Sequence, residues 1–271
     1  MSIDKHYDQS LDPSWILQQV HSVYPAGADL FQLAPLDQLH IGGIKASERL
    51  LRHLDLARHR HILDIGSGAG GLMRQASAMG FSMIGLDITH RFNQLNLGLN
   101  GCFSAPVGNP IITGDAHHLP FADQSLDLIL FQHSFLNMPD NFRVLSECRR
   151  VLKPGGTLLM HEVVCGPQPE QMRYPVPWAD DAVHSHLVTA QTLQQQLQQA
   201  GFVNVQLDDW SDEALAWRHR QLQKEEAGHV SRAALSPALI LGSRFAAMGK
   251  NLVLNLEAGA IRVIELVATR S

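Results

Sequence analysis

The residues with the clearest chemical potential lie in one short stretch, well before the middle of the chain. Residues 61–71 read HILDIGSGAGG, an apolar segment that ends in Asp64 and runs into a glycine-rich turn. Gly66 and Gly68 lack a Cβ atom, so the backbone can turn sharply and a ligand can lie against the peptide N–H groups of the following helix. This pattern is typical of a loop that binds a nucleotide cofactor.

The glycines alone leave the class of cofactor open. Gly66, Gly68 and Gly71 also fit the G-x-G-x-x-G spacing of a dinucleotide site, and Asp87 lies where such a site needs a ribose-binding acid. Asp64 argues against a dinucleotide, because a carboxylate directly before the glycines repels a pyrophosphate and favours a cationic amino group. The sequence therefore favours a cofactor with a positively charged end.

A third acid and a Pro-Gly-Gly turn extend the pattern. Asp115 follows the short apolar segment 110–113, so its carboxylate is expected at the tip of another strand, where it can accept a hydrogen bond from an adenine amino group. Residues 151–159 read VLKPGGTLL, which indicates a helix end, a turn and a buried strand. Together, in this order, these motifs resemble those of the class I S-adenosylmethionine (SAM) methyltransferases.

The resemblance covers roughly residues 30–270 and points to one branch of that family. Segments similar to the sarcosine/dimethylglycine N-methyltransferases are 37–43, 132–137, 174–179 and 241–259. Residues 136–138 and 185–188 depart from that branch, near the expected substrate pocket. The resemblance implies SAM as cofactor, S-adenosylhomocysteine as product, and an amine nitrogen as the methyl acceptor.

The same resemblance implies which residues contact the cofactor. They are Asp64, Gly66, Ser67 and Gly68 for the methionine part, Asp87 for the ribose hydroxyls, Ile88 under the adenine, Asp115 and Ala116 at its edge, and Gln132 and His133 beside the sulfonium. A purely structural alternative exists for the acids, since Asp64 and Asp87 can cap a turn or a helix and Asp115 can simply favour a loop.

Two histidines at predicted strand ends are candidates for catalysis. His133 follows the fourth strand, and His161, next to Glu162, ends the fifth. His161 and Glu162 are suited to accept a proton from an ammonium acceptor before methyl transfer, while His133 is expected beside the sulfonium. A strand-end histidine can also simply bond a loop carbonyl, and a substrate amine can lose its proton to water.

Five residues are expected at the acceptor. Arg173 is suited to pair with a substrate carboxylate, while Phe135, Tyr174 and Trp178 are suited to surround an ammonium group through cation–π contacts, with Asn137 beside them. The alternative is that Tyr174 and Trp178 anchor a proline-rich loop to the core.

Short apolar segments alternate with helical patterns, as in a parallel sheet covered on both faces. We therefore expect a doubly wound, mostly parallel seven-stranded α/β fold. Strands are predicted near 61–66, 82–87, 110–113, 126–132, 156–163, 202–208 and 260–268, and helices near 11–24, 45–56, 70–79, 90–99, 140–151 and 190–200.

Two segments are longer than the connections that a minimal sheet of this kind needs between its strands. Residues 166–185 predict a long non-helical crossing, and residues 211–258 predict a helical insertion. We expect a leading helical segment (1–57), a SAM-binding core (58–210 and 259–271) and an insertion (211–258). The leading helices, the crossing at 166–185 and the insertion are expected to form a lid over the acceptor. Dimer packing by 211–258 is the alternative, so a monomer or a homodimer is expected.

Composition narrows the class of protein. The 271 residues carry 21 Lys and Arg against 26 Asp and Glu, a net charge of −5, which argues against a nucleic-acid substrate. The N-terminus lacks an apolar signal core and no apolar run reaches membrane-spanning length, so a cytoplasmic protein without a membrane partner is expected. The three cysteines give neither a disulfide framework nor a zinc spacing, and the histidines predict no metal site.

The sequence thus predicts a SAM-dependent methyltransferase that acts on a small polar molecule, at an amine nitrogen. Because loops decide the acceptor in this fold, an O- or C-methyltransferase of a secondary-metabolite pathway is an alternative. Others are an enzyme that closes the aminobutyryl chain of SAM on itself and releases methylthioadenosine, an NAD-dependent oxidoreductase and a non-catalytic SAM sensor.

Overall fold

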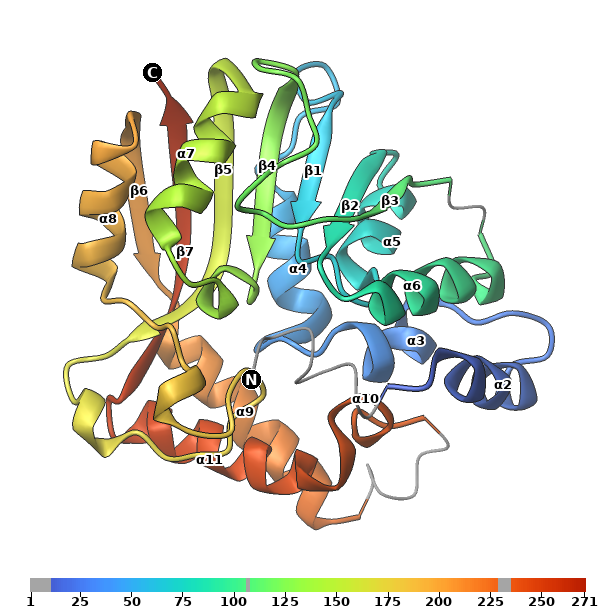
Figure 1. The fold of residues 1–271 in the computed structure, drawn as a ribbon. Coiled ribbons are helices and arrows are strands. Elements are labelled where there is room, and N and C mark those ends of the chain that lie inside the picture. Colours follow the sequence, from blue (N-terminus) through green and yellow to red (C-terminus); the bar gives the residue numbers. More distant parts are fainter. Residues whose placement is uncertain (1–10, 106–107, 229–234) are drawn as a thin grey trace.

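The computed structural model describes residues 11–105, 108–228 and 235–271, whose strands form one sheet (Figure 1). The strand order is β3-β2-β1-β4-β5-β7-β6, and β7 alone in this sheet is antiparallel to its neighbours. The strands are β1 (Ile62–Ile65), β2 (Met83–Asp87), β3 (Ile111–Thr113), β4 (Leu126–Gln132), β5 (Leu152–Cys165), β6 (Phe202–Asp209) and β7 (Ile261–Arg270). The predicted doubly wound, mostly parallel seven-stranded sheet is confirmed.

Helices alternate with these strands much as the sequence predicts. They are α2 (Pro13–Val23), α4 (Gly43–Leu51), α5 (Gly71–Ala78), α6 (His90–Cys102), α7 (Asn141–Val151) and α8 (Ala190–Gln199). The fifth strand differs from the prediction, because it begins at Leu152 and takes in the Pro-Gly-Gly turn as an irregularity in its pairing with β4.

Helix α3 (Leu30–Asp37) is an addition that the sequence analysis missed. It contains Pro35, which cannot donate a backbone hydrogen bond, yet a capping box between Asp29 and Gln32 fixes its start. The buried guanidinium of Arg74 on α5 pairs with Asp37 at 2.8 Å. This ion pair ties the end of α3 to the helix that follows the glycine loop.

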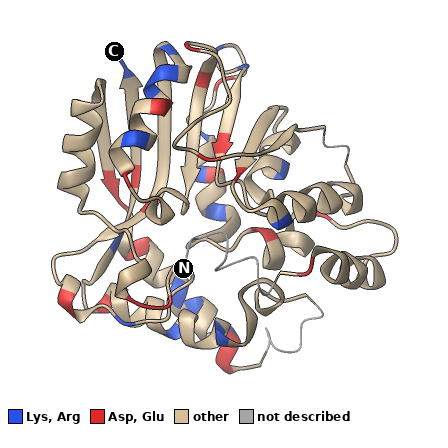
Figure 2. Ribbon diagram, in the orientation of Figure 1, with Lys and Arg blue, Asp and Glu red and all other residues tan. Residues whose placement is uncertain are grey.

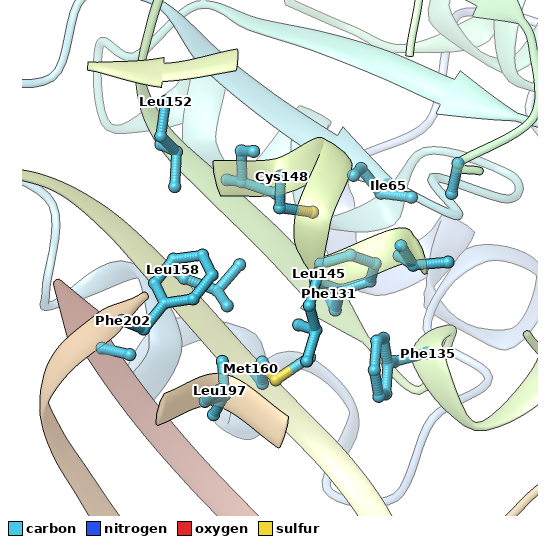
Figure 3. Packing of buried hydrophobic residues seen from close by; sticks show 14 of the residues in the cluster. Ile65, Phe131, Phe135, Leu145, Cys148, Leu152, Leu158, Met160, Leu197 and Phe202 are labelled. Atoms are coloured by element: carbon cyan, nitrogen blue, oxygen red, sulfur yellow. The ribbon is translucent and has the colours of Figure 1, made fainter. Parts of the chain in front are cut away.

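The two faces of the sheet bury separate apolar clusters, because side chains alternate along each strand. Ile62 packs on one face with α4 and α5, whereas Leu63 packs on the other with α7 and α8. Figure 3 shows part of the second cluster, in which Phe131, Phe135, Leu145, Met160 and Phe202 lie together. In Figure 1, α7 and α8 lie in front of the sheet and α4 behind it.

A further layer lies beyond the carboxyl ends of the parallel strands (Figure 1). It contains α2, α3, α9 (Ser211–Glu226), α10 (Ala238–Leu241) and α11 (Phe245–Glu257), with the single turns η1 (Phe135–Asn137), η2 (Pro169–Gln171), η3 (Ala182–His184) and η4 (Gly242–Arg244). The crossing at 166–185 is largely irregular but includes η2 and η3. These segments cover the edge of the sheet where open α/β folds bind ligands.

Acidic and basic residues are interspersed over the ribbon in Figure 2. Within the described ranges, no helix combines the length and the apolar character that crossing a bilayer requires.

Candidate functional site

One cavity of about 650 Å³ opens at the carboxyl ends of β1, β2 and β4. Asp64 lies in β1, Asp87 ends β2 and Asp115 follows β3, and all three line this cavity. The same cavity is lined by Gly66, Ser67, Gly68, Ile88, Ala116, Gln132 and His133. Every residue that the sequence analysis assigned to the cofactor therefore lies around one space.

Asp64 is the most deeply buried of the three acids, with 2% of its surface exposed. Among the described residues its carboxyl group has no hydrogen-bond partner, and burial, helped by the nearby Asp87, raises the pKa of Asp64 to about 7. A carboxyl group in this condition gains from a cationic ligand, which would replace the lost hydration and favour ionisation.

Asp87 joins the glycine loop to the start of α6. Its Oδ2 accepts a hydrogen bond from the backbone N–H of Gly68 at 3.0 Å, and its Oδ1 accepts one from Thr89 at 2.8 Å. Burial raises the pKa of Asp87, and these two hydrogen bonds oppose that rise. The backbone contacts agree with the structural role considered for Asp87, but its place on the cavity wall leaves the carboxylate able to meet a ligand.

The glycine loop needs residues without side chains. Gly66 and Gly70 have φ values of 75° and 85°, which L-residues rarely adopt. A Cβ on Gly66 would lie 2.3 Å from the Cβ of Ser134, and one on Gly70 would lie 1.9 Å from Oδ1 of Asn96. The hydroxyl of Ser67 in this loop is buried without a hydrogen-bond partner among the described residues, so the loop presents an unused polar group beside the cavity.

Asp115 is bonded locally and is the most exposed of the three acids. Its Oδ1 accepts hydrogen bonds from the backbone N–H and from Nδ1 of His117, at 2.9 and 2.6 Å. These contacts outweigh desolvation and lower the pKa of Asp115. Asp115 thus plays the structural role considered for it, because its hydrogen bonds to His117 stabilise the loop. Asp115 also lines the cavity.

The end of β4 brings two polar side chains to the cavity. Gln132 exchanges hydrogen bonds with the hydroxyl of Ser47 on α4. His133 has a φ of 52°, an unusual conformation for a residue with a side chain, and its Nε2 is buried without a partner in the described part of the chain. This strained backbone turns the imidazole of His133 into the cavity wall.

His161 and Glu162 lie behind this wall and do not line the cavity. His161 donates from Nε2 to the carbonyl of Ile41 at 3.0 Å, and burial lowers its pKa to about 4. Glu162 accepts hydrogen bonds from the backbone N–H groups of Ser134 and Phe135, and burial raises its pKa to about 8. Glu162 therefore holds the turn after β4 from behind, and His161 stacks on the ring of His133.

The residues predicted to hold the acceptor divide into two groups. Asn137 and Trp178 line the cavity, and Oδ1 of Asn137 is buried without a described partner. Phe135 belongs to the apolar core, Tyr174 packs on the cluster that contains Trp178, and neither lines the cavity. Arg173 lies away from the cavity as well, where its backbone is bonded to the side chain of Asn255.

Several further residues complete the cavity wall, and the sequence analysis did not select them. The most informative is His40, which lies within about 6 Å of the rings of both His133 and His161 and donates to the carbonyl of Gly43 at 3.1 Å. Burial lowers the pKa of His40 to about 3. Others are Asp37, Ser134, Asp180, Asp181, His184, His186, Leu241 and Leu252. The motif at 37–43 carried a signal for Asp37 and His40, and the segment 241–259 carried one for Leu241. No motif singled out Asp180, Asp181 or His184.

A doubly wound sheet with one antiparallel strand near its edge, and with acids at three neighbouring strand ends around one cavity, defines a Rossmann-like fold of the methyltransferase class. Residues 63–160 match the family described as methyltransferase domain. A ubiquinone/menaquinone biosynthesis C-methyltransferase from Ralstonia pickettii is 30% identical over 168 residues, which cover 54% of this chain and 68% of that protein. The chain belongs to this methyltransferase family, and the resemblance read from the sequence is confirmed.

Two other similarities bear on the expected branch and fold. A sarcosine/dimethylglycine N-methyltransferase from Halorhodospira halochloris is 29% identical over 182 residues, 63% of each chain. A phosphoethanolamine N-methyltransferase from Haemonchus contortus, solved with phosphomonomethylethanolamine and S-adenosylhomocysteine, superposes with a TM-score of 0.74 at 16% identity, over 89% of this chain and 56% of that one. The matches to four further curated relatives span only 32 to 58% of their lengths.

Proposed function

We propose that this protein transfers the methyl group of SAM to a small acceptor, at an amine nitrogen. The observation that carries the proposal is the state of Asp64. Its buried carboxyl group lies beside the glycine loop without a hydrogen-bond partner in the described residues, and a cationic ligand that donates hydrogen bonds would compensate such a group. The ammonium group on the methionine part of SAM is a cation of this kind.

The other cavity residues fit the remaining parts of SAM. The roles proposed are Asp64 with Gly66, Ser67 and Gly68 for the methionine part, Asp87 for the ribose hydroxyls, Ile88 and Ala116 for the faces and edge of the adenine, and Asp115 for its amino group. Two features support this assignment: the hydroxyl of Ser67 has no hydrogen-bond partner in the described part of the chain, and Cβ atoms on Gly66 and Gly70 would clash with neighbouring side chains. When bound, SAM supplies an electrophilic methyl group on a sulfonium.

The protein's own contribution is orientation and the handling of one proton. Orientation alone supplies about 7 to 11 kcal/mol in favourable systems. His133 lies on the cavity wall, and its Nε2 has no hydrogen-bond partner within the described ranges. Burial together with His161 and His40 lowers its pKa well below the ordinary value, so the ring is neutral at pH 7. A neutral imidazole can take the proton that an acceptor N–H loses. Gln132, next to it, is held in place by Ser47.

The layer beyond the strand ends is proposed to be the lid. Trp178, Leu241 and Leu252 come from the crossing at 166–185 and from the insertion at 211–258, and all three line the same cavity as Asp64. These segments would exclude water and shape the acceptor pocket. The division into a leading segment (1–57), a core (58–210 and 259–271) and an insertion (211–258) follows from this role.

Methyl transfer to oxygen or carbon is the main alternative, because the relatives include a 27-O-demethylrifamycin SV methyltransferase and a ubiquinone/menaquinone biosynthesis C-methyltransferase. The test is an incubation with SAM bearing a deuterated methyl group and a panel of amines, phenols and acidic C–H compounds, followed by mass spectrometry. The proposal expects S-adenosylhomocysteine and a labelled amine. Release of methylthioadenosine instead would indicate intramolecular closure of SAM, and the absence of heat in a calorimetric titration with SAM would refute the assignment of the cavity.

A further inference from the structure

A small side pocket of about 30 Å³ adjoins the main cavity. The two spaces share the walls formed by Leu39, His40, Ile41, Pro177, Leu241 and Leu252. The far wall of the side pocket comes from α9 and α11 and includes Trp217, Arg218, Phe245, Met248 and Gly249. The side pocket therefore lies between the acceptor end of the cavity and the helical insertion.

Arg218 is the charged residue of this far wall. Only 5% of its surface is exposed, and its two Nη atoms contact the carboxylate of Glu225 at 3.3 to 3.5 Å. Its Nε is buried and has no hydrogen-bond partner among the described residues. Buried donors are rarely left unpaired, because the lost hydration is not recovered. Arg218 lines the side pocket, and one of its N–H groups, buried beside this mainly apolar space, thus awaits an acceptor atom.

The surroundings restrict what that acceptor atom can be. Glu225 already compensates the positive charge of the guanidinium, so a second carboxylate at Nε would place an additional anion in a dry pocket. The small volume admits a single polar group. An uncharged oxygen, such as a hydroxyl, ether or carbonyl oxygen, satisfies both conditions.

We infer that Arg218 is a specificity-determining residue that binds an uncharged oxygen at the far end of the methyl acceptor. This inference rests on the proposed function for the reacting end. The acceptor then has a nucleophilic nitrogen near His133, an apolar middle against Leu39, Leu241 and Leu252, and a terminal oxygen that accepts from Nε of Arg218. An amino acid such as sarcosine, whose carboxylate lies close to its amine, does not have this form.

The test uses two matched series of probes, n-alkylamines from butyl to octyl and the ω-amino alcohols of the same chain lengths. Their affinities for the full chain saturated with S-adenosylhomocysteine are measured by calorimetry. At one chain length, the amino alcohol is expected to bind at least about 10-fold more tightly than the alkylamine, the effect of one hydrogen bond to a charged donor. Arg218→Lys keeps a positive charge for Glu225 but removes the Nε donor, so this preference should fall to about one.

Two further variants show whether an effect of Arg218→Lys comes from the lost donor or from poor folding. Arg220→Lys, at an exposed position on the same helix, should keep the preference. Gly249→Ala adds a methyl group 2.8 Å from Nη2 of Arg218 and 3.1 Å from Glu225, which displaces the guanidinium, while alanine favours the helix. It should lose the preference as Arg218→Lys does, with unchanged affinity for S-adenosylhomocysteine.

The outcomes separate this inference from the proposed function. Equal affinity for the two series in the wild type would mean that Arg218 binds only a water there, and would overturn the inference. A preference that survives both variants, or an absence of binding by either series, would overturn it as well. In all three cases the binding of S-adenosylhomocysteine is measured separately and still tests the proposed function. If that nucleoside does not bind, the proposed function fails, and the same comparison on the free protein still decides whether Arg218 selects an oxygen.

Discussion

The imidazole rings of His133 and His161 are stacked, with centroids 5.1 Å apart and 21° between their planes. His161 donates to the carbonyl of Ile41, while His133 lies on the cavity wall with an Nε2 that no described residue bonds. A positive charge on His161 disfavours one on His133, and burial acts in the same direction on both pKa values. The pair therefore keeps a neutral imidazole at the proposed reaction centre throughout the physiological pH range.

The first prediction concerns His133 as proton acceptor. His133→Asn should lower the rate of methyl transfer by about 10²- to 10⁴-fold, the range typical of a lost general base, while SAM affinity changes by a few-fold at most. Single-turnover kinetics with an acceptor from the amine panel would measure the rate, with His219→Asn on the exposed face of α9 as the control. An unchanged rate in His133→Asn would mean that the acceptor loses its proton to solvent before it binds.

Asp87 provides the second prediction, because it both braces Gly68 and faces the cavity. Asp87→Ala removes hydrogen bonds to a charged group, each worth about 1.5 to 3 kcal/mol, so affinity for S-adenosylhomocysteine should fall by at least about 10-fold. Calorimetry would measure this fall, and circular dichroism would show a folded chain. Asp123→Ala removes an exposed aspartate that pairs with Arg150 and should leave the affinity unchanged. Equal affinities of the Asp87→Ala and wild-type proteins would assign Asp87 a structural role only.

The raised pKa of Asp64 predicts a pH dependence of SAM binding. In the free protein the carboxyl is half protonated near pH 7, and a bound ammonium group favours the ionised form. Affinity should therefore fall as pH decreases below about 7, by at most about 10-fold per pH unit, with proton release on binding at pH 6. Titrations in buffers of different ionisation enthalpy would detect the released proton. Asp64→Asn should bind weakly and without this dependence; the same slope in that variant would point to another group.

The raised pKa of Asp64 also predicts a pH dependence of the free energy of unfolding. Its direction is opposite to that of SAM binding, because stability without ligand falls as pH rises. Because its pKa is raised in the folded protein, the folded state binds more protons than the unfolded state between about pH 4 and 7. The contribution of Asp64 to the free energy of unfolding should thus decrease as pH rises through this window. In the absence of ligand, Asp64→Asn is expected to be more stable than the wild type at pH 8 and closer to it at pH 4, measured by urea denaturation. A stability difference independent of pH would contradict the raised pKa.

Much of the fold was predictable because the strands carry local signals. Apolar segments ending in Asp64, Asp87 and Gln132 mark strands whose order follows from the doubly wound pattern, and parallel strands bring those ends to one edge. Helix α3 was missed because Pro35 argues against a helix, whereas its capping box and its ion pair with Arg74 stabilise it. The second of these interactions joins distant segments and could not be read from the local sequence.

The acceptor end of the site was less predictable for the same physical reason. Asn137 and Trp178 line the cavity as expected, but Arg173 and Tyr174 lie in the same predicted loop and do not. Which way a side chain in an irregular loop points depends on tertiary contacts, such as the bonds that Asn255 makes to the backbone of Arg173. The motif at 37–43 indicated the segment of His40, whereas Arg218 reaches the side pocket only through packing between segments far apart in the chain.

Trp178 and Tyr174 form a matched pair for the last prediction, since both pack on the same apolar cluster and only Trp178 lines the cavity. Trp178→Leu should raise the KM for an amine acceptor by about 2- to 30-fold, because it removes a cation–π contact of about 0.5 to 2 kcal/mol, and should leave SAM affinity unchanged. Tyr174→Leu should lower the melting temperature without changing that KM. Steady-state kinetics and thermal unfolding of both variants would measure these effects. The indole Nε1 of Trp178 donates to the hydroxyl of Ser185 at 3.2 Å. A lower melting temperature with an unchanged KM in Trp178→Leu would therefore mean that the indole only anchors the loop.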